Sequence, residues 1–215
     1  MKKLKMAIFD LDGTLANTLP LCIKAFKESI EPLANRALSD AEIIATFGPS
    51  EEGTIKALLA DDHHANALIE YYNSYTKLHD MVPACFEGIP DVLSFLEQNG
   101  VLITMVTGKG EKSALLSLEK FGVLHYFRHV ETGNPEGPSK EKGIVNILKK
   151  FNLDSDEVIY VGDAPSDITA ARKSNVPVVA VTWAPTTDKQ ALEELKPNQL
   201  IETVSDFFTY LKSRI

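Results

Sequence analysis

The sequence of 215 residues contains little cysteine and no long hydrophobic run. Its two cysteines, Cys22 and Cys85, form no CxxC pair and have no metal-ligand spacing, which argues against a disulfide scaffold and favours a reducing compartment. The basic start of the sequence leads into an apolar stretch that Asp10 ends, and this stretch is too short for the core of a signal peptide. Because no later apolar run could span a membrane, we expect a cytoplasmic protein with no membrane partner.

Positive charge is also scarce. The net charge is −8, the isoelectric point is about 5.2, and no run of five or six basic residues occurs. These features argue against nucleic acid as a partner. An anionic substrate remains compatible with an acidic protein when a divalent cation lies between the two.

The apolar residues that are present form an alternating pattern of strands and helices. Four of five strand-like segments are rich in β-branched residues without clean alternation, as in strands covered on both faces, and Arg128 and His129 interrupt the remaining one. Helical spacing separates the later segments, so we expect a doubly wound α/β domain with a mostly parallel sheet. The predicted strands are 5–9, 102–107, 126–131, 158–162 and 176–182, and the predicted helices of this part are 89–100, 111–123, 140–153 and 204–215.

Residues 16–83 read as one helix after another, with no strand among them. Because this stretch directly follows the first predicted strand, we expect an inserted all-helical cap domain on an α/β core made of residues 1–15 and 84–215. The segments 16–18 and 82–88 are the expected hinges.

Polar side chains gather where the predicted strands end. In a parallel sheet the carboxyl ends of the strands meet at one edge, and ligands bind there. A turn, a helix cap or an ordinary strand position could explain any one of these residues, whereas their coincidence at successive strand ends favours a binding site. The residues are Asp10, Asp12, Thr107, Gly108, Lys109, Lys140, Lys142, Asp163 and Asp167.

Four carboxylates at one edge favour a hard divalent cation. Mg²⁺ prefers oxygen ligands and is commonly held by one or two carboxylates together with substrate phosphate. The ion would relieve the repulsion between Asp10 and Asp12 and leave Thr107 and a lysine to face an anion. Residues two apart in an extended segment point to the same side, so both acids could flank one phosphoryl group.

The motif "DLDGT" at 10–14, a hydroxyl-ended strand, a lysine and "GDAPSD" at 162–167 together resemble the haloacid dehalogenase-like hydrolase superfamily. A helical insertion after the first motif resembles its members with a type 1 cap, such as the phosphoglycolate phosphatase-like and β-phosphoglucomutase-like groups. The resemblance covers essentially the whole chain. It implies a Rossmann-like core and a Mg²⁺-dependent phosphatase that acts on a small phosphorylated metabolite, as a monomer or a homodimer.

The resemblance also implies roles for individual residues. Asp10 corresponds to the nucleophile that becomes an aspartyl phosphate, and Asp12 to the general acid and base. The phosphoryl group would be bound by Thr107, Gly108, Lys109 and Lys140. The metal would be held by Asp10, the backbone carbonyl of Asp12 and Asp163, with Asp167 acting through water or by orienting its neighbours.

Two departures from the family pattern leave alternatives open. Gly108 stands where asparagine is frequent, and no proline follows the lysine, so both Lys140 and Lys142 are candidates; Lys140, at the mouth of the next helix, is the preferred one. A β-phosphoglucomutase-like phosphomutase is the alternative enzyme, and a non-catalytic binding module is a further one. Thr14 and Leu15, directly after "DLDG", favour the hydrolase, and Asp12 argues against a dehalogenase.

Substrate selection is expected from the cap, with the loop 47–54, "FGPSEEGT", as the candidate segment. Ser50, Glu51 or Glu52 could meet a polar substrate, or the loop could be only a turn with Ser50 as helix N-cap. The paired acids would disfavour a carboxylate such as phosphoglycolate unless a lysine such as Lys109 compensates. The five histidines show no ligand spacing, and Trp183 is expected to pack near the rim of the site.

Overall fold

A six-stranded sheet, in which all neighbouring strands run parallel, forms the centre of the protein. The computed structural model describes residues 3–215, so residues 1 and 2 of the predicted core segment lie outside the described part of the chain. The strand order is β3-β2-β1-β4-β5-β6, which reverses at β1 as in a doubly wound sheet. The strands are β1 (Met6–Phe9), β2 (Leu102–Val106), β3 (His129–Glu131), β4 (Val158–Gly162), β5 (Val178–Val181) and β6 (Gln199–Ile201).

Strand β1 lies in the middle of the sheet and sets the position of the polar motifs. All four of its residues are buried, as the uninterrupted apolar sequence MAIF predicts for a strand covered on both faces. Its last residue, Phe9, is in register with Met105 of β2 and Val161 of β4. The residues that follow these three strands therefore emerge side by side at one edge, which we call the carboxyl edge.

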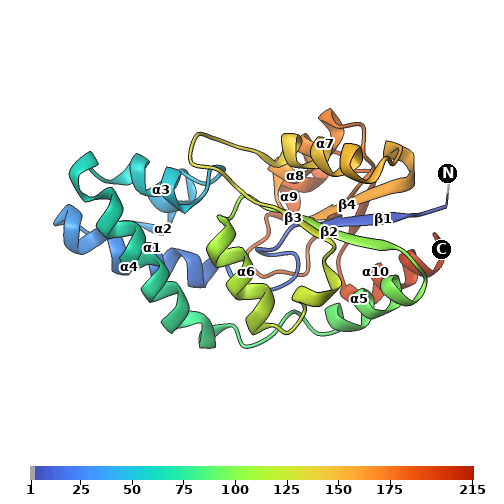
Figure 1. Ribbon diagram of the computed structural model, residues 1–215, viewed down its shortest axis with the longest axis horizontal. Helices are drawn as coiled ribbons and strands as arrows, with labels where there is room; N and C mark the ends of the chain where they lie inside the picture. Colours follow the sequence, from blue (N-terminus) through green and yellow to red (C-terminus); the bar gives the residue numbers. More distant parts are fainter. Residues whose placement is uncertain (1–2) are drawn as a thin grey trace.

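Helices cover both faces of the sheet (Figure 1). On one face, apolar helix residues such as Leu118 and Phe207 join the core, and on the other face Ile147 and Ile168 do so. The first layer contains α5 (Ile89–Gln98), α6 (Glu111–Lys120) and α10 (Val204–Lys212). The second layer contains α7 (Lys140–Phe151), α8 (Pro165–Lys173) and α9 (Lys189–Glu194).

Between β1 and β2 the chain forms a separate group of helices at one end of the molecule, which we call the helical insertion, residues 19–81 (Figure 1). It has its own apolar core, in which the ring centroids of Phe26 and Tyr71 are 4.4 Å apart and those of Tyr71 and Tyr75 are 5.7 Å apart. The helices are α1 (Leu19–Ala34), α2 (Asp40–Ile44), α3 (Glu51–Leu58) and α4 (His64–Leu78), with the 3₁₀ turns η1 (Asp61–His63) and η2 (His79–Met81).

The predicted α/β fold class is confirmed, with two differences in the sheet. Strand β6 is absent from the predicted set, because its short sequence has no apolar run and only pairing with β5 makes it a strand. Strand β3 is shorter than predicted: Leu124–Tyr126 form the 3₁₀ turn η3, and the strand begins at His129. Another 3₁₀ turn, η4 (Ser155–Glu157), precedes β4. Within residues 3–215, no helix combines the length and the apolar character needed to cross a bilayer.

Candidate active site

Three carboxylates and one lysine meet at the carboxyl edge of the sheet. Asp10 follows β1, Asp163 follows β4, and Asp167 lies in the first turn of α8. One oxygen from each of these carboxylates lies within 4.8 Å of the other two. The ammonium of Lys140, the first residue of α7, is 2.6 Å from Oδ2 of Asp10 and 2.6 Å from Oδ1 of Asp167. The fold thus brings together four of the residues singled out in the sequence.

Gly13 allows the turn after β1 to approach Asp163. Its φ of +77° lies in the left-handed region, and a Cβ at this position would overlap the Asp163 carboxylate, so glycine is required. Two hydroxyls then fix that carboxylate: Thr14 donates to Oδ1 at 3.0 Å, and Thr187 donates to Oδ2 at 3.1 Å. Sequence reasoning missed Thr187, for which the only available signal is its place after the last predicted strand.

Both oxygens of Asp167 are engaged by the protein itself. Besides Lys140, its Oδ1 accepts a hydrogen bond from the Tyr160 hydroxyl at 2.8 Å, and its Oδ2 accepts one from the backbone N–H of Ala164 at 2.9 Å. The residue is fully buried. Asp167 therefore suits the task of orienting Lys140 better than that of a direct metal ligand. Tyr160, a β4 residue that pattern analysis assigns only to the core, is a second residue that sequence reasoning missed.

The carboxyl edge carries more negative charge than its lysine offsets. Burial, together with the nearby carboxylates of Asp167 and Asp10, raises the pKa of Asp163 to about 7. Burial likewise raises the pKa of Asp10 to about 6, against the opposing effect of Lys140. Burial lowers the pKa of Lys140, but the two carboxylates outweigh it and the pKa is raised, so the ammonium stays charged. A divalent cation between Asp10 and Asp163 would relieve this excess charge, and the donor set fits Mg²⁺.

A second buried lysine, Lys109, follows β2 and lies against the helical insertion. Its ammonium is 3.4 Å from Oδ1 of Asp12, 4.0 Å from Oε1 of Glu51 and 3.0 Å from Sγ of Cys22. It also lies 4.6 Å from the centroid of the Tyr75 ring. Burial raises the pKa of Cys22 to about 12, so this thiol is protonated at neutral pH. The Lys109 ammonium is therefore already paired with the carboxylates of Asp12 and Glu51.

Asp12 faces this second lysine rather than the three-carboxylate cluster. Its Oδ1 accepts a short hydrogen bond from the Thr18 hydroxyl, and its side chain keeps 27% of its surface exposed. Asp10 and Asp12 nevertheless line one cavity. A carboxylate that is partly accessible and held by a hydroxyl and an ammonium is suited to exchange a proton with a bound substrate.

Of the remaining predicted positions, Thr107 and Gly108 line the cavity and Lys142 does not. Thr107 is buried, its Oγ1 accepts a hydrogen bond from the backbone N–H of Lys109 at 3.2 Å, and Thr107 and Gly108 both line the cavity. Lys142 is exposed on α7 and does not line the cavity. The geometry thus favours Lys140 over Lys142 as the lysine of the site.

The loop 47–54 both lines the cavity and links the insertion to the core. The carboxylate of Glu51 accepts a hydrogen bond from the backbone N–H of Gly110 at 2.7 Å and a short one from the Ser113 hydroxyl. Ser50 occupies the N-cap position of α3, but its side chain makes no capping hydrogen bond there. Glu52 does not line the cavity. Of the two acids, only Glu51 reaches the cavity, and its oxygens are already used.

Trp183 and His79 are packing residues. Trp183 is half-buried against the core, and its Nε1–H donates to the Thr14 carbonyl at 3.0 Å, next to the site. His79 is buried and its Nε2 is 3.0 Å from the Ser117 hydroxyl oxygen. Within residues 3–215, the one group of acids, histidines and cysteines that could hold a metal is the carboxylate cluster, which contains no histidine.

A single cavity of about 840 Å³ joins the carboxyl edge to the helical insertion. Its wall includes Asp10, Asp12 and Lys140 at one end and residues of α1, α2, α3 and α4 at the other. This volume lies within the range of typical small-molecule sites, about 300–1,000 Å³. The arrangement can hold a phosphoryl group at the sheet and the group attached to it against the insertion.

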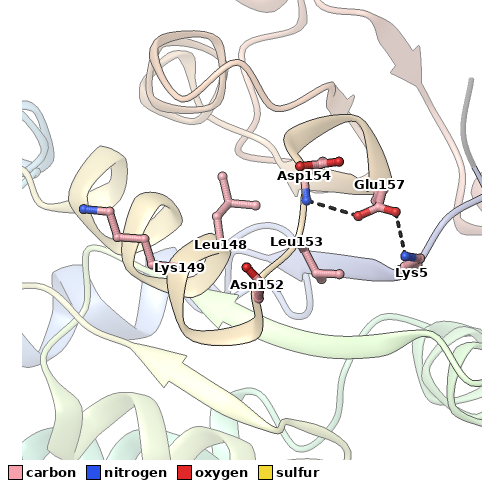
Figure 2. Close-up of a pocket in the computed structure, with 7 residues that line it drawn as sticks. All are labelled: Lys5, Leu148, Lys149, Asn152, Leu153, Asp154 and Glu157. Atoms are coloured by element: carbon pink, nitrogen blue, oxygen red, sulfur yellow. Dashed lines mark hydrogen bonds and ion pairs between the residues drawn. The ribbon is translucent and has the colours of Figure 1, made fainter.

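A different hollow, at the opposite edge of the sheet, has none of these features. Figure 2 shows its seven residues, with Lys5 before β1 and Glu157 before β4. Lys5 Nζ lies 2.6 Å from Oε1 of Glu157, whose Oε2 accepts a hydrogen bond from the backbone N–H of Asp154 at 3.1 Å. Lys149 points away from this pair. These side chains stabilise the turn before β4 and form no chemical site.

Known proteins resemble this chain over nearly its whole length. A pyrophosphatase PpaX from Bacillus pumilus is 28% identical over 203 residues, which cover 93% of this chain and 92% of the relative. A crystal structure of a predicted phosphoglycolate phosphatase from Haemophilus somnus superposes with a TM-score of 0.82 at 22% identity, covering 98% of this chain and 99% of the other. That of a hydrolase from Pseudomonas syringae gives 0.81 at 22% identity, covering 97% and 98%.

The family model described as haloacid dehalogenase-like hydrolase matches residues 7–181, which include every residue of the carboxylate cluster and both buried lysines. The match spans most of the chain, and the two structures above share its fold. With the motifs at 10–14 and 162–167 placed together at the carboxyl edge, the protein belongs to the haloacid dehalogenase-like hydrolase family.

Proposed function

We propose that this protein is a Mg²⁺-dependent phosphatase of the phosphoglycolate phosphatase-like type, which hydrolyses a small phosphorylated metabolite through an aspartyl phosphate. The observation that carries the proposal is the carboxyl edge itself, where Asp10 lies against Lys140 and beside Asp163 in one cavity. Relatives named pyrophosphatase and a structural neighbour named phosphoglycolate phosphatase support phosphoryl chemistry.

Asp10 is the proposed nucleophile. One of its oxygens attacks phosphorus while the bond from phosphorus to the leaving oxygen breaks, which splits one difficult displacement into two easier ones. Lys140 contacts Asp10 directly, so its ammonium lies where the phosphoryl oxygens would arrive. Thr107 and the backbone at Gly108 complete the proposed cradle from the end of β2. Such positioning and charge stabilisation supply most of the catalysis of phosphoryl transfer.

Asp12 is the proposed general acid and base. It gives a proton to the leaving oxygen in the first step and takes one from the attacking water in the second, when phosphate is released and Asp10 is regenerated. The Thr18 hydroxyl and the Lys109 ammonium hold its carboxylate in place.

Asp10, Asp163 and the backbone carbonyl of Asp12 are the proposed holders of Mg²⁺. When bound, the ion neutralises charge on the phosphoryl oxygens and on the carboxylates. Thr14 and Thr187 orient the Asp163 carboxylate. Asp167 orients Lys140 through the contact between its Oδ1 and the Lys140 ammonium.

Residues 16–83 are the proposed cap, which covers the substrate above a core of residues 1–15 and 84–215. The separate apolar core of the helical insertion supports this division. The segments 16–18 and 82–88 are the proposed hinges. The cytoplasmic location and the monomeric or homodimeric state stay predictions.

Phosphate release from a panel of phosphorylated metabolites, measured with and without Mg²⁺, tests the proposal. We expect Mg²⁺-dependent release that Asp10→Asn lowers by at least about 1,000-fold, because the nucleophile is removed. Asp163→Ala should lower activity and weaken its dependence on Mg²⁺. Interconversion of sugar phosphates without release of phosphate would instead identify a phosphomutase, and near-normal turnover of Asp10→Asn would overturn the mechanism.

A further inference from the structure

The end of the cavity that faces the helical insertion has an apolar wall. Of the large hydrophobic side chains exposed among residues 3–215, Ile44 and Phe47 are two, and both belong to this wall. Exposed apolar side chains that gather in a cavity next to a reactive centre are typical of a binding site for an apolar group. The apolar side chains contributed by the insertion are Leu19, Cys22, Phe26, Ile44, Phe47, Pro49 and Tyr71.

The same end has no free cation. Among the described wall residues, the insertion contributes one charged side chain, Glu51, and no lysine, arginine or histidine. Lys109 is matched by Asp12 and Glu51. The other charged wall residues belong to the core: Asp10, Asp12, Lys140, Glu141, Asp163, Lys173 and Asp188.

The lysines of the core add no unpaired positive charge at this end of the cavity. Lys140 is held between two carboxylates at the opposite end, and Lys173 on α8 lies 3.5 Å from Glu141. A second phosphate or a carboxylate on the substrate would therefore be desolvated beside Glu51 without a partner. An unpaired buried charge is strongly unfavourable, whereas an uncharged group avoids this penalty.

One polar group in this apolar wall lacks a partner. The hydroxyl of Tyr71 is buried and has no hydrogen-bond partner, although Tyr71 lines the cavity. Buried hydroxyls are usually hydrogen-bonded in folded proteins. Because the oxygen itself is buried, this hydroxyl offers no polar contact to a ligand, and the wall stays apolar.

We propose that the leaving group of the substrate is uncharged and largely apolar, so that the enzyme hydrolyses phosphate monoesters of neutral aliphatic or aromatic alcohols in preference to pyrophosphate or phosphoglycolate. This inference rests on the proposed phosphatase function. It separates this chain from what the names of its relatives would suggest, because phosphate and glycolate both carry charge into the part of the cavity that holds Glu51.

A matched pair of substrates tests the inference. Benzyl phosphate and 4-carboxybenzyl phosphate differ by one carboxylate far from the reacting phosphorus, so their kcat/KM values compare the leaving-group site alone. We expect kcat/KM for benzyl phosphate to be higher by about 100-fold, the scale of discrimination when a charge is left unpaired in a buried site. Pyrophosphate should also be a poor substrate.

A matched pair of variants tests the wall. Ile44 lines the cavity, whereas Ile69 of α4 does not, and their exposed fractions are 43% and 57%, so both accept lysine without disturbing the core. Ile44→Lys adds a cation to the wall. It should lower the ratio of kcat/KM between benzyl phosphate and 4-carboxybenzyl phosphate by about tenfold, the size of one partly exposed charge interaction. Ile69→Lys should leave the preference unchanged.

The outcomes distinguish this inference from the proposed function. Mg²⁺-dependent hydrolysis that favours 4-carboxybenzyl phosphate, pyrophosphate or phosphoglycolate, or that treats the paired esters alike, overturns the inference and leaves the phosphatase standing. The same holds if Ile44→Lys and Ile69→Lys behave alike. Absence of phosphate release from every compound contradicts the proposed function and removes the basis of the inference with it.

Discussion

The two buried lysines of the cavity have similar partners and different surroundings. Lys140 and Lys109 each lie between two carboxylates, and both keep a raised pKa although burial alone would lower it. At the Lys140 end, Asp163 adds a further carboxylate, and the acids exceed the cations. At the Lys109 end, Glu51 is tied to the backbone of Gly110 and the walls are apolar.

Under the proposed function, this difference would let one end of the cavity bind the phosphoryl group and the other end bind the leaving group. The excess acid at the Lys140 end is relieved only by a cation, which in turn favours a phosphoryl group. The polar groups of the Lys109 end are already satisfied by one another, so they hold the helical insertion to the core and leave the apolar wall for the ligand. In the proposed mechanism, buried charge at the Lys140 end binds the phosphoryl group, and buried charge at the Lys109 end positions Asp12 and holds the helical insertion to the core.

Removal of the first lysine should have the largest effect. Lys140→Ala takes away the cation beside Asp10, and we expect kcat to fall by about 100-fold, the usual loss when one charge-stabilising donor is removed. Steady-state hydrolysis with saturating Mg²⁺ measures it. Lys142→Ala, on the exposed side of α7, is the control, and equal losses in both variants would refute the assignment.

Removal of the Glu51 carboxylate should destabilise the protein at the Lys109 end of the cavity. Glu51→Ala leaves the backbone N–H of Gly110 and the Ser113 hydroxyl without their acceptor, and Lys109 with one carboxylate fewer. We expect the free energy of unfolding to fall by about 1–3 kcal/mol, the cost of buried unsatisfied groups. Urea unfolding measures it, with Glu52→Ala as a matched control that should change little.

The excess of acid at the Lys140 end should make the stability of the protein depend on pH. The pKa of Asp163 is raised from 3.8 to about 7 and that of Asp10 from 3.8 to about 6, so the folded protein binds these protons more tightly than the unfolded chain does. Their contribution to stability is complete below pH 4 and is lost as the pH rises through 6 and 7.

Urea unfolding of the metal-free protein and of Asp163→Asn checks this sign. Relative to the variant, the original protein should lose stability between pH 4 and pH 8, since only it must ionise a third buried carboxylate. Added Mg²⁺ should restore stability at pH 8 more than at pH 5, because the ion binds the ionised form. If the difference in unfolding free energy between the two proteins does not vary with pH, the inferred excess of negative charge at the carboxyl edge is wrong.

The smallest effect concerns two neighbouring tyrosines of α4. Tyr71→Phe removes a hydroxyl that has no partner, so the free energy of unfolding should change by less than about 0.5 kcal/mol. Tyr75→Phe removes a hydroxyl 2.7 Å from that of Ser117 and should cost about 1 kcal/mol. Urea unfolding of the two variants compares them directly, and a larger loss for Tyr71→Phe would mean that its hydroxyl has a structural partner.

The central sheet and the first motif could be predicted from the sequence because both are local patterns. β1, β2 and β4 are short apolar runs, and Asp10 and Asp163 follow them directly. The position of β1 between β2 and β4 then places these acids together. Strand β6 could not be predicted, since it is a strand only through its pairing with β5.

The parts of the site that escaped prediction depend on tertiary contacts. The partners of Glu51 are 59 and 62 positions away in the sequence, and Thr187 meets Asp163 across 24 positions. The loop 47–54 was singled out as the cap segment that selects the substrate, but its composition could not tell whether Glu51 faces a ligand or the backbone of Gly110. Only the packing of α3 against the start of α6 decides that.

The place of β1 in the sheet also affects the order in which the protein can fold as it is synthesised. β1 is made first, yet its neighbour β4 follows about 150 residues later. At about 5–20 residues per second, the ribosome needs roughly 8–30 s to supply it. The helical insertion, with its own apolar core, is complete well before then. The strand that precedes Asp10, the proposed nucleophile, can therefore pair with β2 well before β4 is available on its other side.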